Sequence, residues 1–266
     1  MSSFSGKVVL VTGASSGIGK ATALEFARLG ATVGLMARRG EELEKVAAEM
    51  GGKGIVLPAD VTDEVAVNSR VSELVSQAGG IDVLIAAAGI SLRAPFETTT
   101  IETIRRVMDV NFMGCVLPTK AVLPHIKARK GCMIAISSLS GRKGTPEYTI
   151  YGSSKFAIQA LYDGLRIEHM RDGVNFGVFC PGFVDTPLRE SVLKGDGKVY
   201  ENPPKLPFRL WSVDLCVKKI LRMVRGRLKS SLLPGFLHYL LTADDFVFRG
   251  WISDMVLRYK FGYWRK

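Results

Sequence analysis

The feature that most restricts the fold is a short apolar run followed at once by three glycines and a helical pattern. Residues 7–12 read KVVLVT, and such a run is typical of a strand buried on both faces of a parallel sheet. Apolar residues then recur at helical spacing over residues 21–29, and Gly30 suits the end of that helix. Because parallel strands need crossover connections, this unit predicts an α/β fold.

The glycines also suggest a binding site. Gly13 allows a tight turn, Gly17 lets the backbone approach a pyrophosphate, and Gly19 permits close packing of the helix. The first N–H groups of a helix have no partner within it, so they can bind phosphate oxygens. The segment therefore predicts half of a dinucleotide site, in which the remaining turn residues beside the cofactor are Ser15, Ser16 and Ile18.

A second pattern is a tyrosine and a lysine four residues apart, Tyr151 and Lys155, which would share one face of a helix. A free phenol with a pKa near 10 is a poor acid or base at neutral pH, and a nearby positive charge lowers that pKa. Alone, this spacing is common on solvated helix faces. In the company of the glycine turn, it indicates a group that transfers a proton.

The spacing Gly-x-x-x-Gly-x-Gly, together with Tyr-x-x-x-Lys, resembles the short-chain dehydrogenase/reductase family over about residues 6–190. The resemblance implies a catalytic tetrad of Asn111, Ser138, Tyr151 and Lys155, of which Asn111, Tyr151 and Lys155 also contact the cofactor. It implies further cofactor contacts by Asp60, Val61, Ala87, Gly89, Pro181, Gly182, Val184 and Thr186. The members most similar in appearance act on hydroxysteroids and on 3-ketosphinganine.

One motif departs from the family pattern. Most members carry Asn-Asn-Ala-Gly after the fourth strand, whereas this chain has alanines at positions 86–88 before Gly89. Gly89 still permits a close approach of the cofactor, but two side-chain amides are missing. Their contacts at the sheet edge and the adenine pocket must be replaced or lost.

The tetrad suggests how the chemistry is divided. Tyr151 would protonate a carbonyl oxygen or deprotonate an alcohol, while Lys155 would lower the pKa of Tyr151 and hold the nicotinamide ribose. Ser138, at the end of an apolar run, would share the oxygen, and its neighbour Ser137 would point to the other face. Asn111 resembles the residue that anchors a water chain to the lysine; the alternative is a polar residue that caps or kinks a helix.

The end of the second strand bears on the choice of cofactor. An acidic residue there would accept hydrogen bonds from the ribose of NAD, but Arg38 and Arg39 follow instead. A guanidinium suits a 2′-phosphate, so we expect NADP(H). Surface arginines can also be solvated and idle, which keeps NAD as the less favoured alternative.

The loops that set specificity in this family are mostly apolar here and contribute Ile90, Leu92, Leu139, Tyr148, Phe183 and Leu188. They favour a hydrophobic carbonyl or alcohol, such as a steroid, a retinoid or a long-chain keto-lipid. One rival is a 3-oxoacyl carrier-protein reductase, which an aromatic and basic extension argues against. Another is a non-catalytic NADPH-binding sensor or scaffold, which the intact tetrad argues against.

The length of 266 residues suits one domain, 1–266, with its cofactor and catalytic part at 6–190 and a substrate loop and extension at 187–266. Alternating patterns predict a single doubly wound parallel sheet of the Rossmann type with a helical, aromatic C-terminal extension. We expect a homodimer or homotetramer. The expected strands are 7–12, 32–36, 54–57, 81–85, 132–137 and 175–179, and the later helices are 41–50, 64–77, 101–109 and 155–170.

Composition excludes several other functions. The four cysteines lack Cys-x-x-Cys spacing and nearby histidine pairs, so we expect buried thiols and no metal site. The N-terminus has no signal-like pattern and no run is long enough for a spanning helix, which favours a cytoplasmic location. The basic residues belong to no recognition module, so we expect no nucleic-acid partner.

The C-terminal segment, residues 187–266, differs in charge from the rest. It holds 16 Lys and Arg against 7 Asp and Glu, and so carries nine of the eleven net positive charges. Over residues 244–260 the apolar positions recur at helical spacing, which predicts an amphipathic helix. Its apolar face would either pack on the protein core, a dimer mate or the substrate pocket, or contact anionic lipid as a peripheral membrane surface. That face consists of Val247, Trp251, Ile252, Met255, Val256 and Tyr259.

Overall fold

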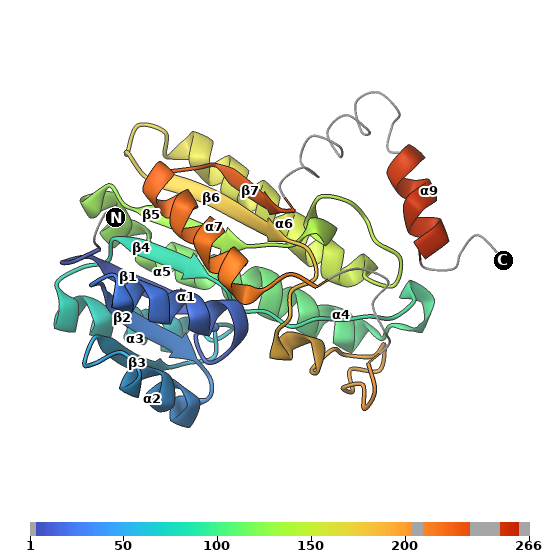
Figure 1. Cartoon of the computed structure of the whole chain (residues 1–266), viewed down its shortest axis with the longest axis horizontal. Coiled ribbons are helices and arrows are strands. Elements are labelled where there is room, and N and C mark those ends of the chain that lie inside the picture. The colour runs from blue at the N-terminus through green and yellow to red at the C-terminus, as the bar shows by residue number, and fades with distance from the viewer. Residues whose placement is uncertain (1–3, 204–209, 235–250, 261–266) are drawn as a thin grey trace.

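Seven parallel strands form one sheet in the computed structural model, which describes residues 4–203, 210–234 and 251–260 (Figure 1). Their order across the sheet is β3-β2-β1-β4-β5-β6-β7, and each neighbouring pair is parallel. The sheet confirms the predicted doubly wound fold. The strands are β1 (Val8–Thr12), β2 (Thr32–Ala37), β3 (Gly54–Pro58), β4 (Val83–Ala86), β5 (Cys132–Ile136), β6 (Asn175–Pro181) and β7 (Ser230–Leu233).

The first four residues of strand β1 are apolar because both faces of the strand are covered. Val9 and Val11 belong to one hydrophobic cluster, whereas Val8 and Leu10 belong to the other. Alternate side chains of a strand point to opposite faces, so a central strand with helices on both sides needs no polar residue. The continuous apolar run read from the sequence has this cause.

Helices cover the two faces of the sheet in separate groups (Figure 1). The first group is α1 (Gly17–Arg28), α2 (Gly40–Ala48) and α7 (Val213–Gly226), whose buried side chains join the cluster of Val9. The second group is α3 (Glu64–Ala78), α5 (Gly114–Arg129) and α6 (Thr149–Glu168), which join the cluster of Leu10. The remaining elements are α4 (Ile101–Met108), a π-helical turn (Asp109–Met113), three 3-10 turns (Phe96–Thr98, Leu139–Gly141 and Pro187–Arg189) and α9 (Trp251–Lys260).

The order of the strands reverses at β1. This strand pairs with β2 on one side and with β4 on the other, and Thr12 lies opposite Ala86 at their carboxyl ends. The crossovers that leave β1 and β4 therefore diverge, and in sheets of this topology the ligand-binding crevice lies between them. The expected switch point is confirmed.

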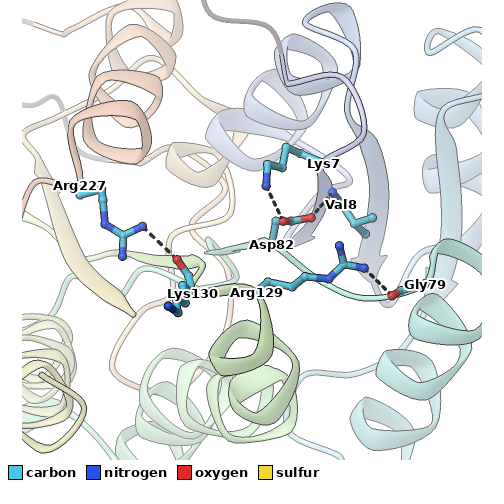
Figure 2. A network of polar contacts seen from close by, with 7 residues as sticks. All are labelled: Lys7, Val8, Gly79, Asp82, Arg129, Lys130 and Arg227. Atoms are coloured by element: carbon cyan, nitrogen blue, oxygen red, sulfur yellow. Dashed lines mark hydrogen bonds and ion pairs between the residues drawn. The ribbon is translucent and has the colours of Figure 1, made fainter. Parts of the chain in front are cut away.

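The opposite, amino-terminal edge of the sheet is held by polar contacts (Figure 2). Asp82, just before β4, is 4% exposed; it accepts hydrogen bonds from Lys7 Nζ at 2.8 Å and from the Val8 backbone N–H at 3.0 Å. Arg129 donates to the Gly79 carbonyl at 2.7 Å, and Arg227 donates to the Lys130 carbonyl at 3.1 Å. These contacts connect the segments that lead into β1, β4 and β5, and the segment at Arg227, at the amino-terminal ends of the strands.

Several elements differ from the sequence-based expectation. Helix α6 begins at Thr149, six residues earlier than expected, and this start places Tyr151 and Lys155 in one helix. Helix α5 was not predicted, and it contains Pro118 and Pro124. Helix α7 and strand β7 were also missed. The four cysteines are buried, as expected, and burial raises the pKa of Cys115 and Cys180 to about 11.

Only part of the expected C-terminal amphipathic helix can be compared, because residues 244–250, including Val247, lie outside the described residues. Helix α9 exposes most of its apolar side chains, with Trp251 65% and Tyr259 74% exposed. An ion pair of 3.1 Å between Lys143 and Asp254 joins α9 to the loop before α6. In the described ranges, no helix is both long and apolar enough to cross a bilayer.

Candidate active site

The glycine turn between β1 and α1 is packed too closely for side chains. A Cβ at Gly13 would lie 2.8 Å from the Ala88 nitrogen, and one at Gly19 would lie 2.3 Å from the Gly13 carbonyl oxygen. Gly13 and Gly17 also have positive φ angles of 66° and 55°, which favour glycine. The backbone can therefore approach a ligand closely at the carboxyl edge of β1.

The start of α1 is suited to an anion. Its N-cap residue Ser16 makes no side-chain cap hydrogen bond, so the first N–H groups of the helix are not satisfied by that hydroxyl. Ile18 packs against the core and anchors the turn, while Ser15 lies on the turn itself. Free helix N–H groups beside a glycine cradle fit the pyrophosphate of a dinucleotide.

The two arginines after β2 have different partners. Arg39 donates through Nη2 to the Ser15 hydroxyl at 3.1 Å. Arg38 lies 3.9 Å from a carboxylate oxygen of Asp60, and both side chains are exposed. The structure thus places one guanidinium at the glycine turn and the other beside the residue that follows β3.

Asp60 and Val61 follow β3 at the same edge. Asp60 accepts hydrogen bonds from the backbone and hydroxyl of Thr62, at 3.0 and 2.8 Å, which fixes its carboxylate. Val61 is buried and packs so closely on α5 that a Cβ at Gly114 would lie 2.6 Å from its Cγ2. The two residues are therefore held in fixed positions just after the carboxyl end of β3.

Thr12 holds the segment where the alanines replace the usual asparagines. Its Oγ1 accepts hydrogen bonds from the N–H groups of Ala87 at 3.1 Å and Ala88 at 3.2 Å. Thr12 is fully buried, and sequence reasoning did not select it, although a threonine that ends a strand just before the glycine turn was a usable signal. Its hydroxyl joins the ends of β1 and β4 without the missing amides.

Tyr151 and Ser138 meet beyond the end of β5. Burial raises the pKa of Tyr151 to about 12, while a side-chain hydrogen bond with Ser138 acts in the opposite direction. Ser138 also accepts from the Ser140 N–H at 3.1 Å, which orients its hydroxyl. The neighbouring Ser137 donates to the Lys155 carbonyl at 2.9 Å, so its hydroxyl also contacts α6.

Lys155 is nearly fully buried beside this pair. Its Nζ donates to the Ile136 carbonyl at 3.0 Å and lies 5.8 Å from the centre of the Tyr151 ring. Burial lowers the pKa of Lys155 to about 8. The expected lowering of the tyrosine pKa is not found in this structure, because the burial of the phenol dominates its pKa.

Asn111 lies in the π-helical turn between α4 and α5 and is fully buried. Its side chain accepts from the Ile90 N–H at 2.8 Å, and its amide donates to the Ile90 carbonyl and to the Ser154 hydroxyl, both at 3.0 Å. A Cβ at Gly89 would lie 3.1 Å from Asn111 Oδ1 and 3.4 Å from Lys155 Nζ. Asn111 and Lys155 therefore converge on Gly89, and Ser154 is a partner that sequence reasoning missed.

The segment after β6 returns to the glycine turn. Pro181 ends β6, and the Gly182 N–H donates to the Leu233 carbonyl at 2.8 Å. Val184 is buried and pairs with the strand-like segment at Trp211, and a Cβ at Gly17 would touch the Thr186 side chain at 3.4 Å. The structure thus brings the predicted residues 181–186 across the crevice toward α1.

Aromatic and apolar side chains pack near the ring of Tyr151. The Tyr148 ring lies 6.2 Å from the Tyr151 ring and 5.9 Å from the Phe183 ring, both edge to face. Tyr151 also packs against a small cluster that contains Leu92 and Leu193. Two cavities of about 340 Å³ each border the loop at 144–149, and Tyr151 and Ser138 line neither of them.

A model of the family described as short chain dehydrogenase matches residues 7–197. The mosquito protein "Dehydrogenase/reductase SDR family protein 7-like" of Anopheles gambiae is 39% identical over 204 residues, which are 73% of this chain and 64% of that protein. The frog protein "Dehydrogenase/reductase SDR family member 7B" of Xenopus laevis is 35% identical over 238 residues, 86% of this chain and 74% of that protein. The chain thus spans less than two thirds of the mosquito relative.

Solved structures share the fold over most of the chain. An alcohol dehydrogenase from Thermococcus sibiricus, complexed with 5-hydroxy-NADP, matches with a TM-score of 0.75 and 28% identity, over 85% of this chain and 95% of that one. A 3-ketoacyl-(acyl-carrier-protein) reductase from Brucella melitensis, complexed with NADH, matches with a TM-score of 0.75 and 25% identity, over 86% and 96%. Both forms of the nicotinamide cofactor are thus represented among its structural neighbours.

Proposed function

Because the chain belongs to the short-chain dehydrogenase family, we propose that it is an NADP(H)-dependent oxidoreductase that interconverts a ketone and a secondary alcohol. The observation that carries this proposal is the meeting of Ser138, Tyr151 and Lys155 at the carboxyl edge of the sheet, next to the crevice that the glycine turn lines. A proton donor, a hydrogen-bond donor and a cation are the groups that a developing alkoxide requires.

When bound, the reduced nicotinamide supplies a hydride to the carbonyl carbon. Tyr151 gives its proton to the carbonyl oxygen, and Ser138 donates a hydrogen bond to the same oxygen. The raised pKa of Tyr151 keeps the phenol protonated at neutral pH, which suits its role as the acid in reduction. The Lys155 ammonium lies near enough to stabilise the tyrosinate that remains.

NADP(H) is the proposed cofactor because Arg38 and Arg39 flank the turn and no acidic residue ends β2. The Arg39 contact with Ser15 aims one guanidinium at the turn, and a 2′-phosphate there would gain charge-assisted hydrogen bonds. Asp60, 3.9 Å from Arg38, partly offsets that positive charge. Arg39 is therefore the more direct phosphate contact of the two.

The proposed substrate is a hydrophobic ketone or alcohol of the steroid, retinoid or long-chain keto-lipid class. This assignment is supported by the packing of Tyr151 against Tyr148, Phe183 and the Leu92 cluster. Such a wall offers few hydrogen-bond partners to a sugar or another highly polar substrate. The rivals are a carrier-protein reductase and a protein that binds NADPH without turnover.

The experiment that tests this proposal follows the absorbance of NADPH while steroid, retinoid and long-chain ketones are added, with a 3-oxoacyl carrier protein as a further arm. We expect oxidation of NADPH with a hydrophobic ketone and a loss of about 100-fold or more in Tyr151→Phe, which keeps the ring but not the proton. Turnover of the carrier-protein substrate alone would favour the first rival. Tight NADPH binding without any turnover would favour the sensor.

We also propose that α9 contacts an anionic lipid surface. Trp251, Val256 and Tyr259 are exposed on it, and Arg258 and Lys260 lie on the same short helix. An exposed apolar stripe beside cations suits the boundary between headgroups and acyl chains. The excess of positive charge over residues 187–266 provides the complementary long-range attraction.

A homodimer or homotetramer is proposed as the assembled form. Phe156 and Ile167 of α6 are 43% and 74% exposed, so this helix presents apolar surface away from the sheet. Burial of that surface against a second copy would remove it from water. Light scattering on the purified protein measures the number of copies directly.

A further inference from the structure

A strained residue lies two positions before the start of helix α6, which carries Tyr151 and Lys155. Glu147 has a φ of +64°, a left-handed conformation that side chains other than glycine rarely adopt. In the described ranges, the other non-glycine residues with positive φ are Lys130 and Arg227, which are the C-caps of α5 and α7. Glu147 has no such role, because it precedes a helix.

Two contacts hold Glu147 in this conformation. Its carboxylate accepts from Arg93 Nε at 2.6 Å, and its backbone carbonyl accepts from the Ala94 N–H at 2.8 Å. The ion pair is shielded from water, since the side chains of Arg93 and Glu147 are only 13% and 25% exposed. Strain of this kind persists only where the surrounding structure enforces it.

The residues around Glu147 are only partly packed. One cavity of about 340 Å³ is lined by Pro146, Thr149 and residues of α9, and another of similar size is lined by Pro146, Glu147 and the turn at Phe96. Pro146 and Thr149 border both cavities. The hydrogen bonds to Arg93 and Ala94 therefore fix Glu147 at a point where the chain borders open space.

Tyr148, the next residue, faces the chemistry. It is 5% exposed, its ring touches that of Tyr151 edge to face, and the Arg93 guanidinium lies 5.9 Å from its centre. The Tyr148 carbonyl also accepts from the Gly152 N–H at 2.6 Å, which closes the first turn around Tyr151. A change in the backbone angles at Glu147 would move Tyr148 and this first turn together.

Arg93 is itself fixed by the segment beyond the active site. Its N–H donates to the Leu193 carbonyl at 3.0 Å, and its carbonyl accepts from the Tyr200 hydroxyl at 3.0 Å. Residues 192–200 are thus tied to the same strand-like stretch that holds Glu147. This arrangement links the apolar wall near the substrate to the start of the catalytic helix.

We propose that the Arg93–Glu147 ion pair is a positioning latch: it holds Glu147 in its left-handed conformation and so fixes Tyr148 and the acid–base Tyr151 relative to the substrate. Neither latch residue transfers a proton or touches the reacting atoms. The catalytic consequence rests on the proposed function, whereas the structural consequence, a fixed first turn of α6, does not. Small displacements of a reacting group cost large factors in rate, so the latch acts on turnover.

The test uses three latch variants of the full chain: Glu147→Gln, Glu147→Gly and Arg93→Lys. The matched control is Glu25→Gln, which breaks an equally short ion pair with Arg28 at the far end of α1. Each protein is measured for kcat and KM with a ketone, for its Kd for NADPH, for Tm, and for hydrogen exchange at the Gly152 amide. We expect the latch variants to lose about 10- to 100-fold in kcat/KM with an unchanged Kd for NADPH, and the control to lose nothing.

The glycine variant separates positioning from stability. Glu147→Gly accepts the positive φ without strain, so we expect a Tm above that of Glu147→Gln, although both lose the latch and both lose activity. A purely structural ion pair would instead make activity follow Tm across the variants. Activity that follows Tm, or a kcat/KM equal to that of the native protein, would overturn the proposal.

Exchange of the Gly152 amide distinguishes a failed latch from a failed function. This amide donates to Tyr148, so the latch requires faster exchange in all three variants than in the control, with or without substrate. Unchanged exchange would overturn the latch even if the enzyme is active. If the variants exchange faster but the native protein turns over no ketone, the latch is retained and the proposed reaction is rejected.

Discussion

Lys155 shows how one residue can serve chemistry at a cost to stability. It is 5% exposed, its Nζ has a backbone carbonyl as partner, and Cys115 and Cys180 lie near enough to influence its charge. Burial disfavours the ammonium, so its pKa is lowered to about 8. The site thus keeps a cation where the fold alone would prefer an apolar side chain.

We therefore predict that Lys155→Met raises the free energy of unfolding by about 1–3 kcal/mol at pH 7 while it abolishes turnover. Lys155 in the folded protein releases its proton near pH 8, whereas the unfolded chain releases it near 10.5. The unfolded chain binds more protons between these values, so the stability of the native protein rises with pH there. The advantage of Met should accordingly shrink from pH 8 to 10.5, which thermal unfolding across that range measures. A constant difference would contradict this account of Lys155.

Arg38 allows a second test at the scale of a single residue. Arg38→Asp should shift the preference toward NAD, because a carboxylate repels a 2′-phosphate and accepts from a ribose hydroxyl. Its 3.9 Å contact with Asp60 would also be lost, which leaves two carboxylates at this point. The measurement is the ratio of kcat/KM for NADPH to that for NADH, before and after the change. An unchanged ratio would mean that Arg38 does not read the phosphate.

At the scale of elements, the first βα unit follows from local rules. Its helical glycine, Gly19, is packed more tightly than a helical glycine elsewhere in the chain. Gly19 lies in α1 against the Gly13 carbonyl, whereas the space around Gly164 in α6 is open. Both glycines are helical, but their surroundings differ, so we expect substitution by alanine to have opposite effects at the two positions. Comparing the two substitutions therefore separates the effect of packing at the glycine turn from the general preference of helices for alanine.

We predict that Gly19→Ala weakens NADPH binding at least tenfold and lowers Tm, because the new Cβ cannot fit 2.3 Å from a carbonyl oxygen. Its matched control, Gly164→Ala, should raise stability by up to about 1 kcal/mol and leave binding unchanged. Titration of NADPH fluorescence and thermal unfolding give both quantities. Equal effects of the two substitutions would show that the turn is looser than the structure indicates.

The strands were predictable from the sequence because β1 to β6 are mainly apolar runs, and the predicted limits agree with the observed ones to within about two residues. Helix α5 was missed because Pro118 and Pro124 read as breaks in a helix. The early start of α6 was missed because its first turn lacks apolar periodicity and depends on the contacts of Glu147. The candidate site came from motifs, and Thr12 also had a local signal, its place between a strand and the glycine turn. Ser154 and Arg93 act through partners 43 and 54 positions away, for which the sequence holds no local signal.

At the scale of the whole molecule, charge is distributed unequally along the chain. Residues 1–186 are nearly balanced, with 20 Lys and Arg against 18 Asp and Glu, so the excess belongs to the C-terminal part. Helix α9, which exposes Trp251 and Tyr259, lies in that part and stands at the side of the molecule in Figure 1. Apolar exposure and net charge are therefore found together.

We predict that the protein floats with vesicles that contain phosphatidylserine at low salt and is released as salt increases, since each basic residue near such a surface contributes about 1 kcal/mol. Trp251→Ser should weaken this binding without lowering Tm, because the indole is 65% exposed. The control Phe96→Ser changes a similarly exposed aromatic residue, 62% exposed in the turn Phe96–Thr98, and should leave vesicle binding intact. Native protein that stays unbound at low salt, or Trp251→Ser that loses stability instead, would assign α9 to packing within the protein or its assembly.

All strands of the sheet run in one direction, so the amino-terminal and carboxyl-terminal ends of the strands differ in function. The polar contacts around Asp82 lie at the amino-terminal edge, while the glycine turn, Ser138 and residues 181–186 lie at the other. For protein engineering, this difference separates loops that should tolerate an inserted segment from loops that should not. Gly51 and Gly52, between α2 and β3, have open space around them on the edge away from the crevice. A fluorescent reporter or an affinity tag inserted there should leave the fold intact and should not reach the candidate active site at the carboxyl ends of the strands.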